Sequence, residues 1–163
     1  MHKSDITSAI IKQLKQELSL AIIATENAHK AATDDQSVAE TQYDTLAIEA
    51  GYLAHGQAQR VEEINQALKT FQHIEKSLSN TNHIVIGALV QLESHISNNQ
   101  YFFIASAAGG YRCEVSIENT QSAITVITPY SPMGKALMGK VCGDEIELTV
   151  AHTTTTDFIS LVC

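Results

Sequence analysis

The feature that most constrains this chain is a change of composition near residue 80. Residues 1–78 contain no proline and only two of the eight glycines, Gly51 and Gly56. They are rich in Ala, Gln, Glu, Lys and Leu, which favour helix. Residues 83–163 hold both prolines, the other six glycines and runs of Val, Ile and Thr, which favour strands. The sequence predicts two domains, a helical one over 1–78 and a strand-rich one over 83–163.

The apolar residues of the first domain recur at helical spacing in two stretches. An apolar step of three or four residues marks one face of a helix. Pairing the two stripes places the fold-back near residues 40–41, so each arm has about 30 residues and spans about 45 Å. We therefore expect a long antiparallel helical hairpin. Its seam consists of Ile6, Ile10, Leu14, Leu18, Ala21 and Thr25 on one arm and Val61, Ile64, Leu68, Phe71, Ile74 and Leu78 on the other.

The second domain reads as short strands separated by turn residues. Between two of them, Ser131 and Pro132 open a short helix that Gly139 closes. Thr153–Thr156 is interpreted as a turn between strands. The expected product is a small, mostly antiparallel sheet with one short helix. The expected strands cover 84–90, 101–105, 123–128, 145–151 and 157–162.

Charge and cysteine content narrow the partners and the compartment. The net charge is −8, from 18 acidic and 10 basic residues, so a broad basic face for independent nucleic-acid binding is not expected. The start of the chain lacks a signal-peptide core, and the apolar runs are shorter than the roughly 20 residues that span a bilayer. Three cysteines without C-x-x-C spacing favour reduced thiols. We expect a cytoplasmic protein that does not bind membranes.

The expected fold-back of the hairpin is strongly acidic. No Lys or Arg lies between Lys30 and Arg60. Uncompensated carboxylates at the tip of a hairpin repel one another unless a cation or a basic partner relieves them. Helix capping is an alternative use for the first three of these acids, but it explains the last two poorly. The acids are Asp34, Asp35, Glu40, Asp44 and Glu49.

One run in the second domain resembles a family signature. It looks like the pattern S-P-x-[GA]-x-[AG]-L-[ILM]-G-K-x-x-G-D-x-[IV] of the Gre family, the bacterial transcript cleavage factors. The length and the expected hairpin agree with this family. The resemblance implies an α+β chain in which an N-terminal hairpin precedes an FKBP-like antiparallel sheet with a short helix. The matching residues are Ser131-Pro132-Met133-Gly134-Lys135-Ala136-Leu137-Met138-Gly139-Lys140 and Gly143-Asp144-Glu145-Ile146.

The resemblance also implies a partner and a mechanism. The C-terminal domain would dock at the rim of the secondary channel of RNA polymerase, and the hairpin would reach down that channel. Tip carboxylates would help hold a second Mg²⁺ at the polymerase active site and orient water, so that backtracked RNA is cut. Oxygen ligands and retained waters suit this hard cation. The chain would then be no enzyme by itself, would carry no cofactor of its own, and would meet the RNA 3′ end only indirectly.

The resemblance also suggests docking residues. They are the loops around the short helix, namely Ser131, Pro132, Met133, Gly134 and Lys135, together with the turn at 108–111. Backbone geometry alone is an equal alternative for the serine, the proline and the glycine.

The tip departs from the Gre pattern. That pattern places an Asp and a Glu three residues apart before a Tyr. Aligning Tyr43 with the motif Tyr puts Gln36 and Ala39 at the acidic positions, and an alignment through Arg60 and Val61 keeps only Glu40.

A substitute pair of carboxylates is available at the tip. Glu40 and Asp44 lie four residues apart on one helical face, and they are the candidate catalytic residues and Mg²⁺ ligands. Asp35 and Asp34 are further candidates.

Three hypotheses follow from these observations. The first is a factor that stimulates cleavage through the tip carboxylates. The second is a secondary-channel binder that modulates or inhibits polymerase without stimulating cleavage. The third is a coiled-coil adaptor unrelated to polymerase. Polymerase binding separates the third hypothesis from the others, and cleavage of backtracked RNA separates the first from the second.

Overall fold

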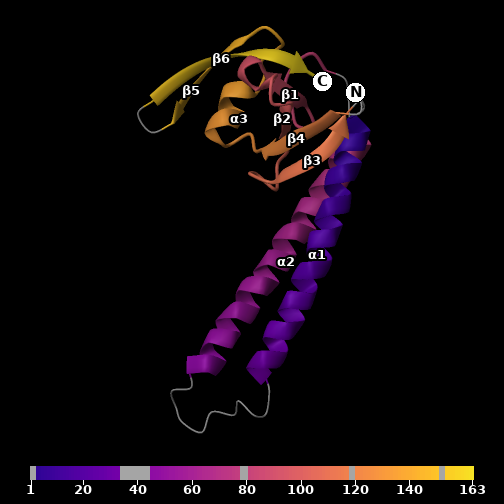
Figure 1. The fold of residues 1–163 in the computed structure, drawn as a ribbon, viewed down its shortest axis with the longest axis vertical. Helices are drawn as coiled ribbons and strands as arrows, with labels where there is room; N and C mark the ends of the chain where they lie inside the picture. The colour runs from indigo at the N-terminus through magenta and orange to yellow at the C-terminus, as the bar shows by residue number, and fades with distance from the viewer. Residues whose placement is uncertain (1–2, 34–44, 78–80, 118–119, 151–152) are drawn as a thin grey trace. The chain divides into compact units, whose positions relative to one another are not determined.

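The structure, a computed structural model, describes residues 3–33, 45–77, 81–117, 120–150 and 153–163. The chain forms two compact units (Figure 1). We call Lys12–Leu68 the hairpin unit, and Met1–Ile11 together with Lys69–Cys163 the sheet unit. The long helices pass from one unit into the other.

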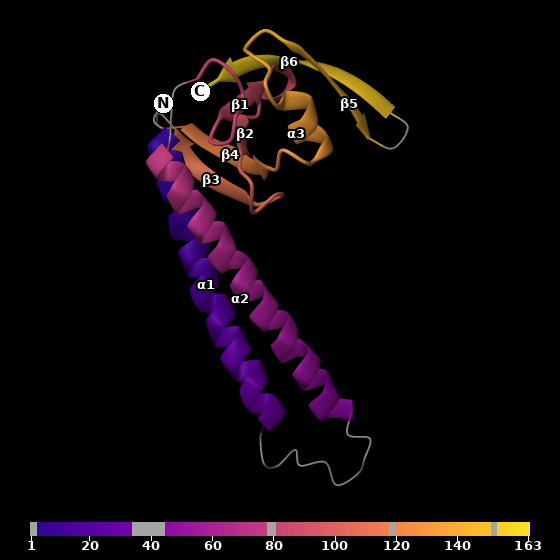
Figure 2. The ribbon, with the colours of Figure 1, turned by 180° about the vertical axis from the view of Figure 1, so that it is seen from behind.

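Two long helices form the first part of the chain, as the apolar stripes predict. Helix α1 covers Lys3–Thr33 and α2 covers Thr45–Ser77, and the two run side by side in Figures 1 and 2. The seam residues Leu14, Ala21, Ile64 and Leu68 are buried. Leu18, Thr25 and Val61 are half-buried, and Leu78 and the expected fold-back near residues 40–41 lie outside the described residues. The two paired helices confirm the predicted hairpin.

The sheet unit contains one mixed sheet of six strands in the order β3-β4-β2-β1-β6-β5. Neighbouring strands are antiparallel except β2 and β4, which are parallel. The helical pieces are a 3-10 turn, η2, at Glu93–His95, and the short helix α3 at Pro132–Leu137. The strands are β1 Leu89–Leu92, β2 Gln100–Ile104, β3 Arg112–Ile117, β4 Thr120–Ile127, β5 Glu145–Val150 and β6 Thr153–Val162.

The central strand β2 is covered on both faces of this sheet. On one face Leu137 of α3 joins a buried cluster that includes Phe102, Ile104 and Ile146. Successive strand residues point to opposite faces, so Phe103 lies on the other face. There its ring stacks on Phe71 of α2, with centroids 5.8 Å apart. The last turns of α2 therefore belong to the core of the sheet unit.

Three details differ from the sequence prediction. The expected strand over 84–90 begins only at Leu89, because Gly87 adopts φ +88° and turns the chain. The expected turn Thr153–Thr156 is the first half of β6, where the threonines pair with β5. Strand β3, which alternates apolar and polar residues, was not predicted.

The three cysteines are free thiols, as the sequence predicts. Cys142 is exposed and Cys163 is half-buried, while Cys113 is buried in β3. Burial disfavours the thiolate and raises the pKa of Cys113 to about 11. Within the described ranges, no helix has the length and apolar content needed to cross a membrane.

Candidate functional site

The four tip carboxylates with a predicted catalytic role, Asp34, Asp35, Glu40 and Asp44, lie outside the described residues. Their role in Mg²⁺ binding stays a prediction. In the described part of the chain, no three His, Cys, Asp or Glu side chains are grouped to hold a metal ion. The site that the structure does describe is α3 and the loops around it.

Helix α3 begins with a side-chain cap. Ser131 has extended backbone angles, and its Oγ accepts a hydrogen bond from the Gly134 N–H at 3.0 Å. The same hydroxyl donates to the Thr128 carbonyl at 2.8 Å. Pro132 occupies the first helical turn, where no donor is missed. The cap and the proline together fix where this short helix starts.

Gly134 is required because two backbone segments approach closely. A Cβ at this position would lie 1.9 Å from the Thr128 carbonyl oxygen and 2.8 Å from its carbon. Backbone atoms cannot move aside as a flexible side chain can. The glycine therefore lets α3 pack against the end of β4.

The second half of the motif forms a tight turn into β5. Gly139 and Gly143 have φ of +78° and +89°, a region that residues with a side chain rarely adopt. Asp144 Oδ2 accepts a hydrogen bond from the Val141 N–H at 2.9 Å, and Lys140 Nζ donates to the Glu145 carbonyl at 2.9 Å. These contacts connect α3 to β5.

The predicted docking residues thus divide by role. Ser131 and Gly134 shape the backbone of α3, and half-buried Met133 packs against the core cluster. Pro132 and Lys135 are exposed. Partner binding by this set stays a prediction, and it suits the exposed pair better than the residues with structural roles.

The segment before β1 adds exposed apolar side chains beside α3. Ile84 N–H donates to the Lys140 carbonyl at 2.8 Å, and Gly139 N–H donates to the Ile84 carbonyl at 2.9 Å. This pairing sets Val85 and Ile86 next to the C-terminal end of α3, where they are 36% and 48% exposed. The exposure of Val85 and Ile86 could not be predicted from the sequence, because the apolar run 84–90 is typical of one buried strand and the turn at Gly87 is not evident from it.

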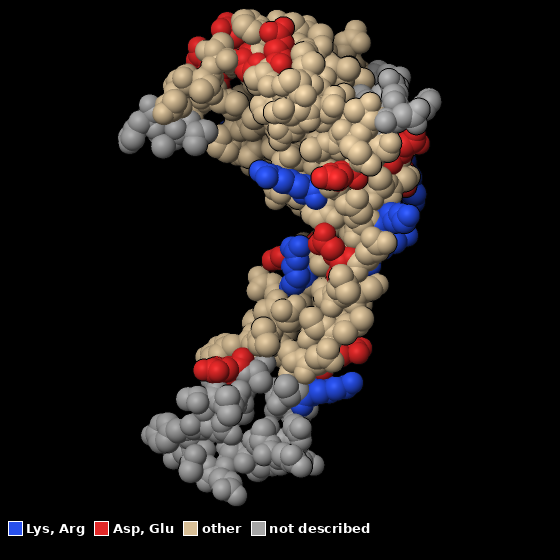
Figure 3. All heavy atoms as spheres, in the orientation of Figure 1, with Lys and Arg blue, Asp and Glu red and all other residues tan. Residues whose placement is uncertain are grey.

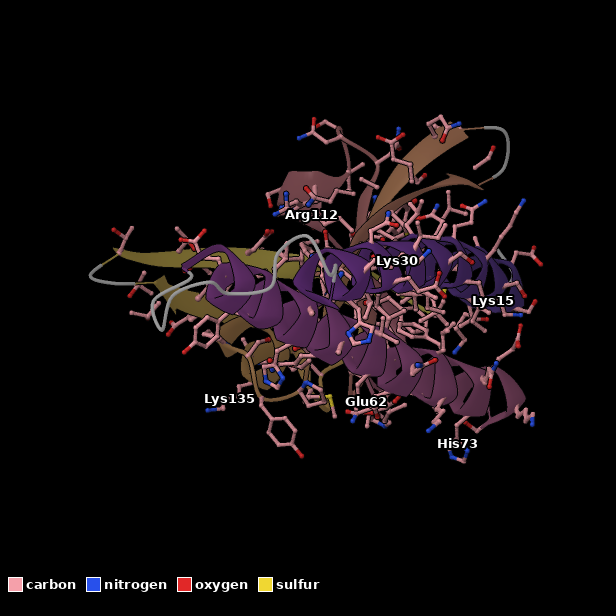
Figure 4. The ribbon with its side chains drawn as sticks, turned by 90° about the horizontal axis from the view of Figure 1, so that it is seen from below. Lys15, Lys30, Glu62, His73, Arg112 and Lys135 are labelled. Carbon is pink, nitrogen blue, oxygen red and sulfur yellow. The ribbon has the colours of Figure 1, made fainter. Side chains whose placement is uncertain are left out.

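We define the α3 surface as Val85, Ile86, Tyr130, Lys135 and Met138. Tyr130 precedes the helix and is 80% exposed, and Met138 follows it and is 36% exposed. Residues other than Lys, Arg, Asp and Glu cover most of the face of the sheet unit seen in Figure 3, with acidic residues along its upper edge, and Figure 4 labels Lys135. Exposed aromatic and apolar groups beside one lysine suit a protein partner that offers apolar and acidic residues.

A second polar cluster joins η2 to β6. Both the backbone N–H and the hydroxyl of Ser94 donate to the carboxylate of Asp157, and Ser94 Oγ lies 2.8 Å from His95 Nδ1. In a hydrolytic triad the histidine stands between the serine and the carboxylate. Here the serine stands between them, so its hydroxyl proton is held by the acid. The cluster has the geometry of a structural clamp.

The clamp shifts the ionisation of its carboxylate. Partial burial opposes the charge on Asp157, but hydrogen bonds from the Ser94 side chain and from the Phe158 and Ser94 backbone, with the nearby His95, outweigh it. The pKa of Asp157 is therefore lowered. The ionised carboxylate is the form that holds η2 against β6.

Comparisons with known proteins give weak likenesses. No known protein family and no curated protein matches the chain. A structure of GreA factor homolog 1 (Gfh1) of Thermus thermophilus and another structure of the transcription factor Gfh1 are each 20% identical to this chain, with TM-scores of 0.35 and 0.36. They cover 94% of this chain and 94% and 93% of their own. Gfh1 of Thermus aquaticus is 17% identical, with a TM-score of 0.34 and coverage of 99% and 96%.

Proposed function

We propose that this chain is a Gre-like transcription factor that binds RNA polymerase at its secondary channel in the cytoplasm. The observation that carries the proposal is the run from Ser131 to Ile146. This run resembles the Gre signature, and several of its residues have defined structural roles. Ser131 caps α3, Gly134 allows a close backbone approach, and Gly139 and Gly143 adopt positive φ. The long helical hairpin that precedes it supports the same proposal.

The α3 surface is the proposed contact with polymerase. Its apolar residues are exposed to solvent in the single chain. Lys135 adds a cation that an acidic partner surface would attract. Of the sequence-derived docking residues, Lys135 belongs to this surface, and exposed Pro132 lies on the same helix. Tip carboxylates Glu40 and Asp44, with Asp35 and Asp34, would then serve the polymerase Mg²⁺ and stimulate cleavage of backtracked RNA. The chemistry would belong to the polymerase, so the chain is proposed not to act as an enzyme alone.

A second candidate function requires the same binding to the polymerase secondary channel. The altered tip pattern favours a secondary-channel binder that modulates or inhibits transcription without stimulating cleavage. Both functions require polymerase binding, and only the first requires the tip carboxylates.

Binding is tested with two matched substitutions in a titration against core polymerase. Ile86→Asp changes the α3 surface, and Ile96→Asp changes an isoleucine of similar exposure elsewhere in the sheet unit, 48% against 50%. We expect Ile86→Asp to weaken binding about tenfold or more, and Ile96→Asp to bind as the unchanged chain does. Equal affinities with unchanged circular dichroism would reject the α3 surface. No binding by the unchanged chain would reject the function.

Cleavage is tested on a backtracked elongation complex with Mg²⁺ and labelled RNA. The unchanged chain and a Glu40→Ala/Asp44→Ala variant are compared at saturating concentration. RNA shortening that the double variant loses supports the cleavage function. Binding without shortening supports the modulator.

A further inference from the structure

The distal half of α1 exposes apolar residues on the outside of the hairpin. Leu20, Ile22 and Ile23 are 67%, 42% and 53% exposed, while the seam residue Ala21 between them is buried. Lys15 lies before this group and Lys30 lies about two turns after it, both exposed. Lys30 already has an interaction within this chain, so Lys15 is the stronger charge of the two. Figure 4 labels both lysines on α1. We call the three apolar residues and the two lysines the basic-flanked patch.

The opposite helix carries a patch of the other charge. Tyr52 and Leu53 of α2 are 76% and 56% exposed. Glu49 lies one turn before them and Glu63 about three turns after them, and both side chains are exposed. Glu63 also lies 3.6 Å from Arg60 of its own helix, so Glu49 is the stronger charge of the two. At 100° per residue the two acids and the two apolar residues fall within one side of the helix. We call these four the acid-flanked patch.

The charges of the two patches match in spacing. Lys15 and Lys30 are 15 residues apart and Glu49 and Glu63 are 14 apart, which gives about 22 Å and about 21 Å along a helix. If α1 lies parallel to a foreign α2 with Lys15 opposite Glu49, then Lys30 comes within one residue of Glu63.

The same alignment also matches the apolar groups. Leu20 then falls within one residue of Leu53, and Ile23 falls within one residue of Gly56. Gly56 has no atom within 4 Å of the place where its Cβ would be. It therefore offers room for a side chain from outside.

This alignment cannot form within one chain, because α1 and α2 of one hairpin are antiparallel. An ion pair between Arg60 and Glu17, 3.2 Å apart, shows where the two arms lie opposite each other. A molecule that paired with either patch in this alignment would therefore be a separate one, and a second copy of the chain offers both the apolar residues and the opposite charges.

We propose that this chain self-associates through its hairpin unit, with the basic-flanked patch of one copy on the acid-flanked patch of another. Both patches are exposed in the single chain, and each offers only two or three apolar side chains. The contact is therefore small, and we expect it to be reversible and weak. It does not depend on polymerase binding.

Sedimentation velocity over a wide range of protein concentration tests the proposal. The unchanged chain should move from the mass of one chain towards that of two or more. Ile23→Lys should raise the dissociation constant about tenfold or more, because it places a third cation in the apolar centre. Ile96→Lys is the matched control, since Ile96 is 50% exposed in the sheet unit, and it should associate as the unchanged chain does.

A charge exchange tests the pairing itself. Lys15→Glu and Glu49→Lys should each weaken self-association, and an equimolar mixture of the two variants should regain part of it, because each then meets an opposite charge. Higher salt should weaken the unchanged contact. A single-chain mass at all concentrations, equal effects of Ile23→Lys and Ile96→Lys, or a mixture no stronger than its components would each overturn the proposal. Polymerase binding of the variants that no longer self-associate is measured separately, and it tests the proposed function alone.

Discussion

The core of the sheet unit and the distal seam of the hairpin unit, beyond Leu14 on α1, are built from different side chains. In the sheet unit Phe103, Leu89 and Ile146 are fully buried. Along the distal seam of the hairpin the buried positions of α1 are Ala21 and Ala28. A methyl group buries far less apolar area than a phenyl or a branched chain.

The two regions therefore differ in how much their buried side chains contribute to stability and in how much apolar surface they expose. Large side chains give the sheet unit a core of interlocking groups. In the distal part of the hairpin unit, the buried seam residues of α1 are alanines, and larger residues such as Ile23 and Tyr52 remain outside. Substitution of buried residues should therefore cost more in the sheet unit. In the hairpin unit, substitution of exposed residues should change self-association.

Loss of the ring that joins α2 to the sheet should have the largest effect. Phe103→Ala leaves a cavity beside Phe71, and such truncations cost about 3–5 kcal/mol. Urea unfolding followed by circular dichroism measures this free energy. Phe158→Ala is the control, because its ring is 42% exposed, and it should cost much less. Equal losses for the two variants would contradict the buried position of Phe103.

A methyl group at Gly134 should have the next largest effect. Gly134→Ala brings Cβ to 1.9 Å from the Thr128 carbonyl oxygen, so backbone must move. We expect a loss near the upper end of about 1–3 kcal/mol, as for overpacked sites. The measurement is again urea unfolding. A variant as stable as the unchanged chain would mean that α3 does not approach β4 this closely.

The same change in the hairpin unit should have the opposite sign. Gly51 lies within α2, and no atom lies within 4 Å of the place that a Cβ would take. Gly51→Ala should stabilise by about 0.5–1 kcal/mol, because alanine favours helix and restricts the unfolded chain. A rise in thermal midpoint and in helical circular dichroism would show this. Destabilisation would mean that this side of α2 is already covered.

The clamp between η2 and β6 should give the smallest effect, and one that depends on pH. The pKa of Asp157 is lowered in the folded chain. Its contribution to stability is thus present above the ordinary aspartate pKa of about 3.9 and is lost as pH falls through the folded value.

Urea unfolding of the unchanged chain and of Asp157→Asn from pH 7 downward tests this contribution. The stability difference should be largest at pH 7 and should shrink in acid. Ser94→Ala, which removes the hydroxyl donor, should show a weaker pH dependence than the unchanged chain. A difference that stays constant with pH would assign Asp157 a purely steric role.

The helices and the short capped helix could be predicted from the sequence because their signals are local. Apolar steps of three and four residues place Ile10, Leu14 and Ile64 in the seam, and Ser131-Pro132 marks the start of α3. The strands were less predictable, because Thr153–Thr156 resembles a turn until β5 is available to pair with it. Propensity is overridden there by the partner strand.

The α3 surface could be predicted only in part. Lys135 and Pro132 lie inside the motif and were expected, but Val85 and Ile86 lie about 50 residues earlier and meet α3 only through the pairing of Ile84 with Lys140. Exposure of such residues depends on Gly87, whose φ cannot be derived from an apolar run. Non-local pairing, rather than residue type, decided this part of the site.

The order of the strands has a consequence for synthesis of the chain. Strand β6 lies between β1 and β5, so the sheet cannot close until residues 153–162 have emerged. The roughly 94 residues from Leu68 to Val162 take about 5–20 s at typical translation rates of about 5–20 residues per second. During that interval the hairpin can already be helical, while Phe71 still lacks the strand residue Phe103 on which its ring stacks. A nascent chain therefore passes through a stage with a formed hairpin and an exposed apolar base, and this is the stage at which chaperone binding is expected.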